Sequence, residues 1–145
     1  MKKIILAIIA LIGVASAASA QCGDDLMKKA LGAMGGYQYI KDFDINVPAG
    51  AKDGTSFSIV LNSRTHYQIN VANGAANPEH VTIKIIDKNS GKLIGINASN
   101  GKVFDTFQFI CGKTGAYILQ VTCPGEGCAR AVLSLVKQYT EAEMP

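Results

Sequence analysis

The stretch VTIKIIDKNSGKLIGI, residues 81–96, contains the pattern that decides the fold. Apolar residues alternate with polar ones from Val81 to Ile85, and a period of two is typical of a β-strand with one buried face. The tetrapeptide KNSG at 88–91 then places turn-forming residues before a second apolar run, KLIGI. The stretch therefore predicts a β-hairpin.

The same pattern recurs along most of the chain. Besides this hairpin, six runs alternate in the same way: YQYIKDFDINV (37–47), SFSIVL (56–61), HYQINV (66–71), VFDTFQFIC (103–111), AYILQVTC (116–123) and CARAVLSLVK (128–137). About eight short strands separated by turn signals predict an all-β fold, an antiparallel β-sandwich of jelly-roll-like type. In the first run the odd positions carry the apolar side chains, which assigns Tyr37 and Tyr39 to the buried face, with partial exposure of either tyrosine as the alternative.

A different period precedes the strands. In GDDLMKKALGAMGG, residues 23–36, apolar residues recur at helical spacing, and Asp24 and Asp25 suit the start of a helix. We expect Met27, Ala30, Leu31 and Met34 to share one face and Gly35-Gly36 to end the helix. The predicted division is a helical segment at 21–36, a β-sandwich domain at 37–138 and a polar tail at 139–145.

The first twenty residues resemble an export signal. Lys2 and Lys3 precede an 11-residue apolar run and a small-residue end, which predicts a signal peptide at 1–20 with cleavage between Ala20 and Gln21. The run is too short to span a bilayer as a helix, so we expect a secreted or periplasmic protein with no membrane span in its mature chain. The mature chain would carry 12 basic and 11 acidic residues. This near-neutral balance leaves no basic stripe that would bind nucleic acid. We also expect the mature chain to be a monomer.

Four cysteines lie in the predicted mature chain. An exported chain with an even number of cysteines favours disulfides. A Pro-Gly turn separates Cys123 from Cys128, which favours a bridge across a hairpin and leaves Cys22 to pair with Cys111. Other pairings stay open. A thiol redox site and a zinc site using His66 and His80 are alternatives that the spacing and the oxidising compartment disfavour.

Other candidate chemistry is sparse. The chain has no G-x-S-x-G motif to accompany its two histidines. Asp42 and Asp44 share one strand face and are expected to face solvent, although with Asp53 they are an alternative calcium site. Asn97-Ala98-Ser99 matches a glycosylation acceptor but is interpreted as an ordinary turn. The chain has no Trp, and Tyr139 in the tail is the aromatic residue expected to be exposed.

The segments VTIKIIDKNSGKLI, FDTFQF and GKTGAYILQV resemble the pre-peptidase C-terminal (PPC) domains of small secreted bacterial proteins over roughly residues 55–123. Gly115, Tyr117 and Val121 stand where that family has the glycine, tyrosine and following apolar residue of its closing strand. The resemblance implies a non-catalytic accessory or binding module.

Together these patterns predict an exported, non-catalytic binding or structural module of the bacterial envelope or extracellular space. Its partner would be an unknown protein or carbohydrate ligand, and no catalytic residue, metal ligand or cofactor is predicted. The alternatives are a small secreted enzyme, either a hydrolase or a thiol oxidoreductase, and a divalent-metal-binding module.

Overall fold

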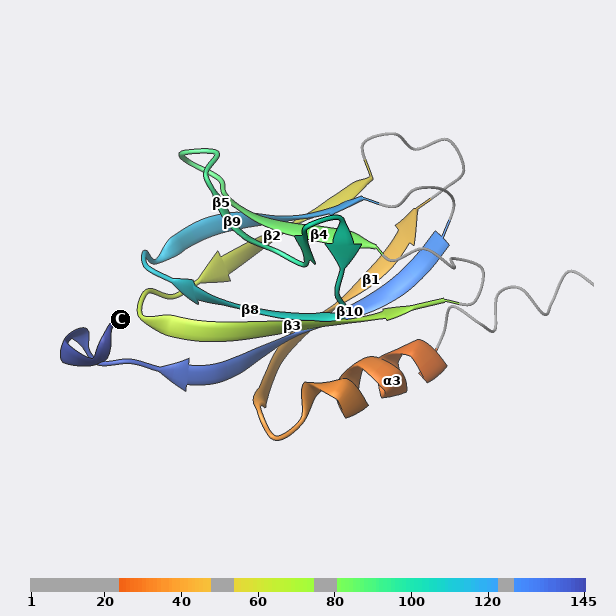
Figure 1. Cartoon of the computed structure of the whole chain (residues 1–145), viewed down its shortest axis with the longest axis horizontal. Helices are drawn as coiled ribbons and strands as arrows, with labels where there is room; N and C mark the ends of the chain where they lie inside the picture. Colours follow the sequence, from red (N-terminus) through yellow and green to blue (C-terminus); the bar gives the residue numbers. More distant parts are fainter. Residues whose placement is uncertain (1–23, 48–53, 75–80, 123–126) are drawn as a thin grey trace, which may run out of the picture.

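The computed structural model describes residues 24–47, 54–74, 81–122 and 127–145, which form two packed β-sheets with one α-helix outside them (Figure 1). Sheet A contains, in spatial order, β1 (Gln38–Val47), β10 (Gly127–Gln138), β3 (Thr65–Asn73) and β8 (Thr106–Cys111). Sheet B contains β2 (Thr55–Leu61), β9 (Gly115–Thr122), β4 (Thr82–Asp87) and β5 (Leu93–Ile96). All neighbouring strands are antiparallel, so the predicted sandwich is confirmed.

The strand order is that of a jelly roll. When the strands of the two large sheets are counted along the chain, sheet A takes the first, eighth, third and sixth, and sheet B takes the second, seventh, fourth and fifth. The chain thus crosses between the layers at most connections, as in two interlocked Greek keys. These eight strands correspond to the eight alternating runs of the sequence.

The core lies between the sheets and is built from the predicted faces of the strands. Phe43 of β1 packs on Phe57 of β2 with their ring centroids 5.2 Å apart, and Ile83, Ile85 and Leu119 are fully buried. Burying a side chain of this size contributes about 1.5–3 kcal/mol. The alternation therefore reports which face of each strand meets the opposite sheet.

The helix α3 (Asp24–Met34) covers the outer face of sheet A (Figure 1). Leu26 and Ala30 are buried against Ala72 and Val132 of the sheet, as a second apolar cluster. Leu31 is 37% exposed, so its predicted place on the buried face is wrong, because the contact with the sheet is centred on Leu26 and Ala30.

Side-chain amides of the sheet complete the C-terminal end of α3. The carbonyl of Ala33 accepts a hydrogen bond from Asn70 Nδ2 at 3.0 Å, and that of Met34 accepts one from Gln68 Nε2 at 3.3 Å. These carbonyls have no partner within the helix. Asn70 and Gln68 occupy positions that alternation assigns to solvent, yet both are buried.

The first half of β1 departs from its predicted face. The pairing register with β10 shifts between Tyr39 and Lys41, and a one-residue shift turns the side chains before it to the other face. Tyr37 and Tyr39 are therefore 38% and 43% exposed, which agrees with the alternative of partial exposure and not with the buried face that the alternation assigns to them. Phe43 and Ile45, beyond the shift, are buried as predicted.

Asn97 is a buried bridging residue. Its Oδ1 accepts a hydrogen bond from the Ile83 amide at 2.7 Å, and its Nδ2 donates to the carbonyls of Val81 and Phe104 at 2.8 and 3.0 Å. A glycan acceptor must be exposed, so this asparagine is not one. The small hairpin of β6 (Ala98–Ser99) and β7 (Lys102–Val103) follows it.

Candidate functional site: a pocket among the turns at one end of the sandwich

Three turns gather at the end of the sandwich where the C-terminus lies, on the left of Figure 1. They join β2 to β3, β4 to β5, and β8 to β9. The amide of Ser63 donates to Thr114 Oγ1 at 2.8 Å, and the amide of Lys88 donates to the Ala116 carbonyl at 3.1 Å. These bonds hold the β2–β3 and β4–β5 turns beside the chain at the start of β9.

A pocket of about 360 Å³ opens between the β4–β5 and β8–β9 turns. This volume is within the range of small-molecule sites. The residues that line it are Asp87, Lys92, Leu93, Ile94, Ile110, Gly112, Lys113 and Tyr117. Two lysines thus line the cavity together with aliphatic residues and one aspartate.

Asp87 organises the rim of the pocket. Its Oδ1 accepts hydrogen bonds from the amides of Asn89 at 2.8 Å and Ser90 at 3.4 Å. The bond from Asn89 is the main reason that the pKa of Asp87 is lowered, and the Lys113 charge adds to the shift. Gly91 completes the turn at φ 72°, a conformation that glycine adopts without strain. The carboxylate is therefore ionised at neutral pH and already committed to the turn.

A buried group beneath the pocket holds Lys113 in place. The hydroxyl of Tyr117 donates to the Lys113 carbonyl at 2.6 Å. The Cys111 thiol lies 3.1 Å from the same carbonyl and 3.3 Å from the tyrosine oxygen. Burial, followed by the hydrogen bond with Cys111, raises the pKa of Tyr117 well above its ordinary value. The phenol is thus neutral and supports the β8–β9 turn.

The structure corrects one predicted disulfide. Cys111 is a free, buried thiol, so the Cys22–Cys111 bridge is not formed. The physical reason is distance: Cys111 pairs with Thr65, which pairs with Gln138 at the far end of β10 from Cys128. Ten strand residues span on the order of 30 Å.

The helix start lies at the Cys128 end of that strand, because Leu26 and Cys128 share the cluster beneath α3. Cys22 precedes Asp24, the first residue of α3, by two positions with only Gly23 between them, and two residue steps reach at most roughly 7 Å. Cys128 is disulfide-bonded. Cys22, Cys123 and the predicted cleavage site at Ala20 and Gln21 lie outside the described residues, so the pairing of Cys123 with Cys128 stays a prediction.

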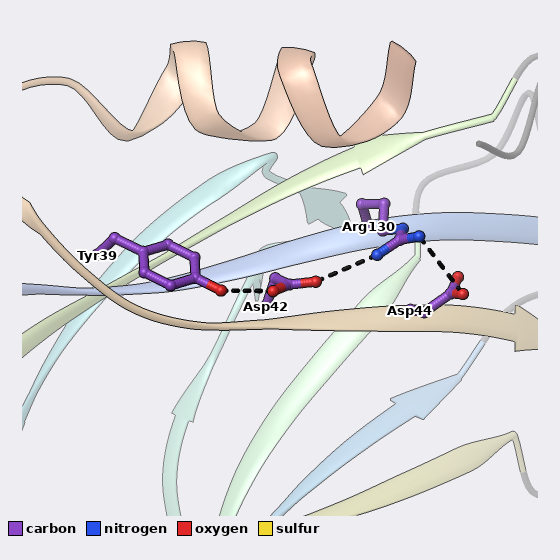
Figure 2. A network of polar contacts seen from close by, with 4 residues as sticks. All are labelled: Tyr39, Asp42, Asp44 and Arg130. Carbon is purple, nitrogen blue, oxygen red and sulfur yellow. Dashed lines mark hydrogen bonds and ion pairs between the residues drawn. The ribbon is translucent and has the colours of Figure 1, made fainter. Parts of the chain in front are cut away.

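A second polar cluster lies on the outer face of β1 and β10 (Figure 2). Arg130 Nη1 lies 3.1 Å from Asp42 Oδ2, and Arg130 Nη2 lies 3.5 Å from Asp44 Oδ2. Tyr39 donates its hydroxyl proton to the other oxygen of Asp42. The two aspartates share one face, as predicted, but a guanidinium lies between them.

No group of three or more His, Cys, Asp or Glu residues suited to a metal ion occurs among the described residues. Asp53, the third member of the alternative calcium site, lies outside that part of the chain, as does His80. A scan of the described ranges also finds no helix that is long and apolar enough to cross a membrane.

His66 and Tyr139 fasten the C-terminal tail. Their rings stack with centroids 6.3 Å apart, and Lys137 Nζ lies 4.8 Å from the Tyr139 ring centroid. The amide of Tyr139 also donates to the Arg64 carbonyl at 2.7 Å. Tyr139 is thus only partly exposed, and its expected exposure in the tail is corrected.

The pocket residues were missed because each lysine alone is an ordinary turn residue. Lys92 follows the KNSG turn, and Lys113 lies in the GKTG turn. The signal that the sequence offers is a lysine at each of two turns. Only the strand order shows that the turns adjoin.

The comparisons with known proteins give a distant structural likeness and no family. No protein-family model matches the chain, and no curated protein matches it. The resemblance to PPC domains therefore extends only to the β-sandwich class.

Among solved structures, the chain is similar to PliG of Aeromonas hydrophila, described as a periplasmic lysozyme inhibitor of g-type lysozyme. The identity is 15% and the TM-score is 0.48, over 70% of this chain and 89% of that chain. Nothing about the partners of this protein follows from a likeness this distant.

Proposed function

We propose that the protein is an exported, non-catalytic binding module that holds an amphipathic anion in the pocket at the turn end. The observation that carries the proposal is the pairing of Lys92 and Lys113 with an aliphatic wall around a cavity of about 360 Å³. Such a site suits a carboxylate or phosphate attached to a small apolar group. The signal pattern of residues 1–20 supports export.

The charges of the turn end support an anionic ligand. Arg64 lies in the β2–β3 turn, and Lys88 lies in the β4–β5 turn that also carries Lys92. Asp87 is the acid of the pocket lining, and its carboxylate is bound to turn amides. A local excess of positive charge attracts anions to the opening.

The titration behaviour of the pocket supports binding over acid–base catalysis. A general acid or base works best with a pKa near the working pH. Here the pKa of Asp87 is lowered and that of Tyr117 is raised, so both move away from neutrality. The hydrogen bonds of Asp87 and Tyr117 hold the β4–β5 and β8–β9 turns in place. The two lysines are the groups that we expect to bind the ligand.

The test uses the mature chain and two pairs of matched probes. Benzoate and hexanoate carry the anionic group, and benzamide and hexanamide are their neutral counterparts. We expect the anions to shift the backbone amide NMR signals of Lys92, Leu93 and Lys113, with dissociation constants of about 1 mM. The amides should bind more weakly, because they lack the charge that the lysines attract.

Two lysine variants and one control complete the experiment. Lys92→Ala and Lys113→Ala should each weaken benzoate binding roughly threefold. Lys102→Ala removes an exposed lysine of β7, which is not among the pocket residues, and should change nothing. Equal binding of acid and amide, or shifts away from the pocket, would refute the proposal.

A further inference from the structure

Exposed apolar side chains concentrate where α3 leads into β1. Four of the seven large hydrophobic side chains that are exposed in the described part of the chain lie within ten residues: Leu31, Tyr37, Tyr39 and Ile40. Such a concentration marks a contact surface more often than scattered single residues do. These residues belong to α3, to the connection after it and to β1, whereas the pocket is lined by residues of β4, β5, β8 and β9 and of the turns beside them.

Tyr39 is held in one orientation on this surface. Its hydroxyl bonds to Asp42, three residues along β1, and Figure 2 shows the ring lying along the strand. The hydrogen bond with Asp42 is also the main reason that the pKa of Tyr39 is raised. A ring fixed before a ligand arrives loses little freedom on binding.

Polar groups continue the same line. Beyond the tyrosine ring, the next side chains in spatial order are Asp42, Arg130 and Asp44 (Figure 2). The two aspartates belong to β1, and the arginine reaches them from β10. The side chain of Asp44 is 66% exposed, and those of Asp42 and Arg130 are 30% and 21% exposed. We call Tyr39, Asp42, Asp44 and Arg130 the β1 strip. The strip presents an exposed aromatic ring followed by planar hydrogen-bonding groups that carry negative and positive charge.

We infer that the β1 strip binds a neutral oligosaccharide laid along the strand. A pyranose ring has an apolar face that stacks on a tyrosine ring, and its hydroxyls bond to carboxylates and guanidinium groups. The strip holds two carboxylates and one guanidinium, so its net negative charge does not attract an anion, and these charged groups would be costly to bury against a lipid. Tyr37, two residues before Tyr39, is the candidate for a second stacking contact.

The test titrates the mature chain with cellotetraose, chitotetraose and mannotetraose, each to about 10 mM, a range that detects weak binding. At least one sugar should shift the backbone amide NMR signals of residues 38–44. Tyr39→Ala should weaken that binding roughly tenfold, whereas Tyr39→Phe keeps the ring and should retain most of it. Asp44→Asn should weaken binding less than Tyr39→Ala does.

Two controls make the outcome decisive. Phe104→Ala removes another exposed aromatic side chain, 48% exposed and outside the strip, and should leave sugar binding unchanged. Lys113→Ala should also leave it unchanged, which separates this inference from the pocket. The inference fails if none of the three sugars shifts the β1 amides, or if Tyr39→Ala binds as the wild type does while the variant gives a folded spectrum.

Discussion

The hydroxyl of Tyr117 donates to the main-chain carbonyl of Lys113 at 2.6 Å, and this bond ties the pocket to the core of the sandwich. Tyr117 is 2% exposed and belongs to the main apolar cluster. The lysine that we assign to the ligand is thus positioned by a buried residue that also lines the pocket.

Tyr117→Phe should therefore affect stability and binding together. Loss of the hydroxyl weakens the support of a turn carbonyl, and we expect a cost of about 1 kcal/mol in the free energy of unfolding. Urea unfolding measures that cost, and benzoate titration should show weaker binding. Tyr67→Phe, which removes the hydroxyl that accepts the Asn62 amide at 2.9 Å in the β2–β3 turn, is the control. If both variants weakened benzoate binding equally, the specific role of Tyr117 would be wrong.

Cys111 should be recovered as a free thiol that reacts only after unfolding. It is fully buried beneath the β8–β9 turn, and a buried thiol reacts slowly with alkylating reagents. The experiment alkylates the native and the denatured mature chain without reductant and maps the peptides by mass spectrometry. A disulfide-linked peptide containing Cys111 would contradict the structure, and the same map identifies the partner of Cys128.

Asp87→Asn should cost stability at neutral pH and cost less in acid. The folded pKa of Asp87 is lowered, so its ionised form stabilises the fold above its unfolded pKa, near 3.9. That contribution disappears as the pH falls through the lower folded pKa. Melting temperatures of the wild type and the variant should therefore differ at pH 7 and converge in strong acid. A difference that stayed constant across this range would assign the effect to something other than charge.

Two glycines with the same backbone conformation should respond differently to alanine. Gly54 and Gly91 have φ of 66° and 72°, so each substitution carries the left-handed backbone cost of about 1 kcal/mol. At Gly54 the added Cβ would also lie 1.8 Å from the carbonyl oxygen of Val121, whereas at Gly91 nothing lies within 4 Å. Gly54→Ala should therefore lower the melting temperature well beyond Gly91→Ala, and equal losses would contradict the close approach.

A comparison of β1 and β4 shows where sequence reasoning holds. In β4 the period-2 pattern continues without interruption, and Val81, Ile83 and Ile85 are buried as predicted. In β1 the register shift near Lys41 reverses the face of the residues before it, so Tyr39 became part of a surface. The sequence marks that place only by Ile40 and Lys41, an apolar and a charged residue that break the alternation. Such a break does not by itself say that the strand changes register.

For the candidate sites, too, the local pattern predicts the elements but not how they lie next to one another. The turn at 88–91 was predicted, but its adjacency to the turn at 112–115 depends on β4 and β9 pairing in register. The buried amides of Gln68 and Asn70 likewise depend on a helix that packs from a distant part of the chain. Long-range pairing of this kind leaves no periodic signal in the sequence.

By itself the sequence determined the strands, the helix and the all-β sandwich class, because these follow from local alternation and turn chemistry. Only the tertiary structure decided that Cys111 stays a thiol, that Lys92 and Lys113 share a pocket, and that Tyr39 faces solvent. Each of those outcomes depends on a distance between residues far apart in the chain. Such distances are set by strand order and register, which the pattern within one strand does not encode.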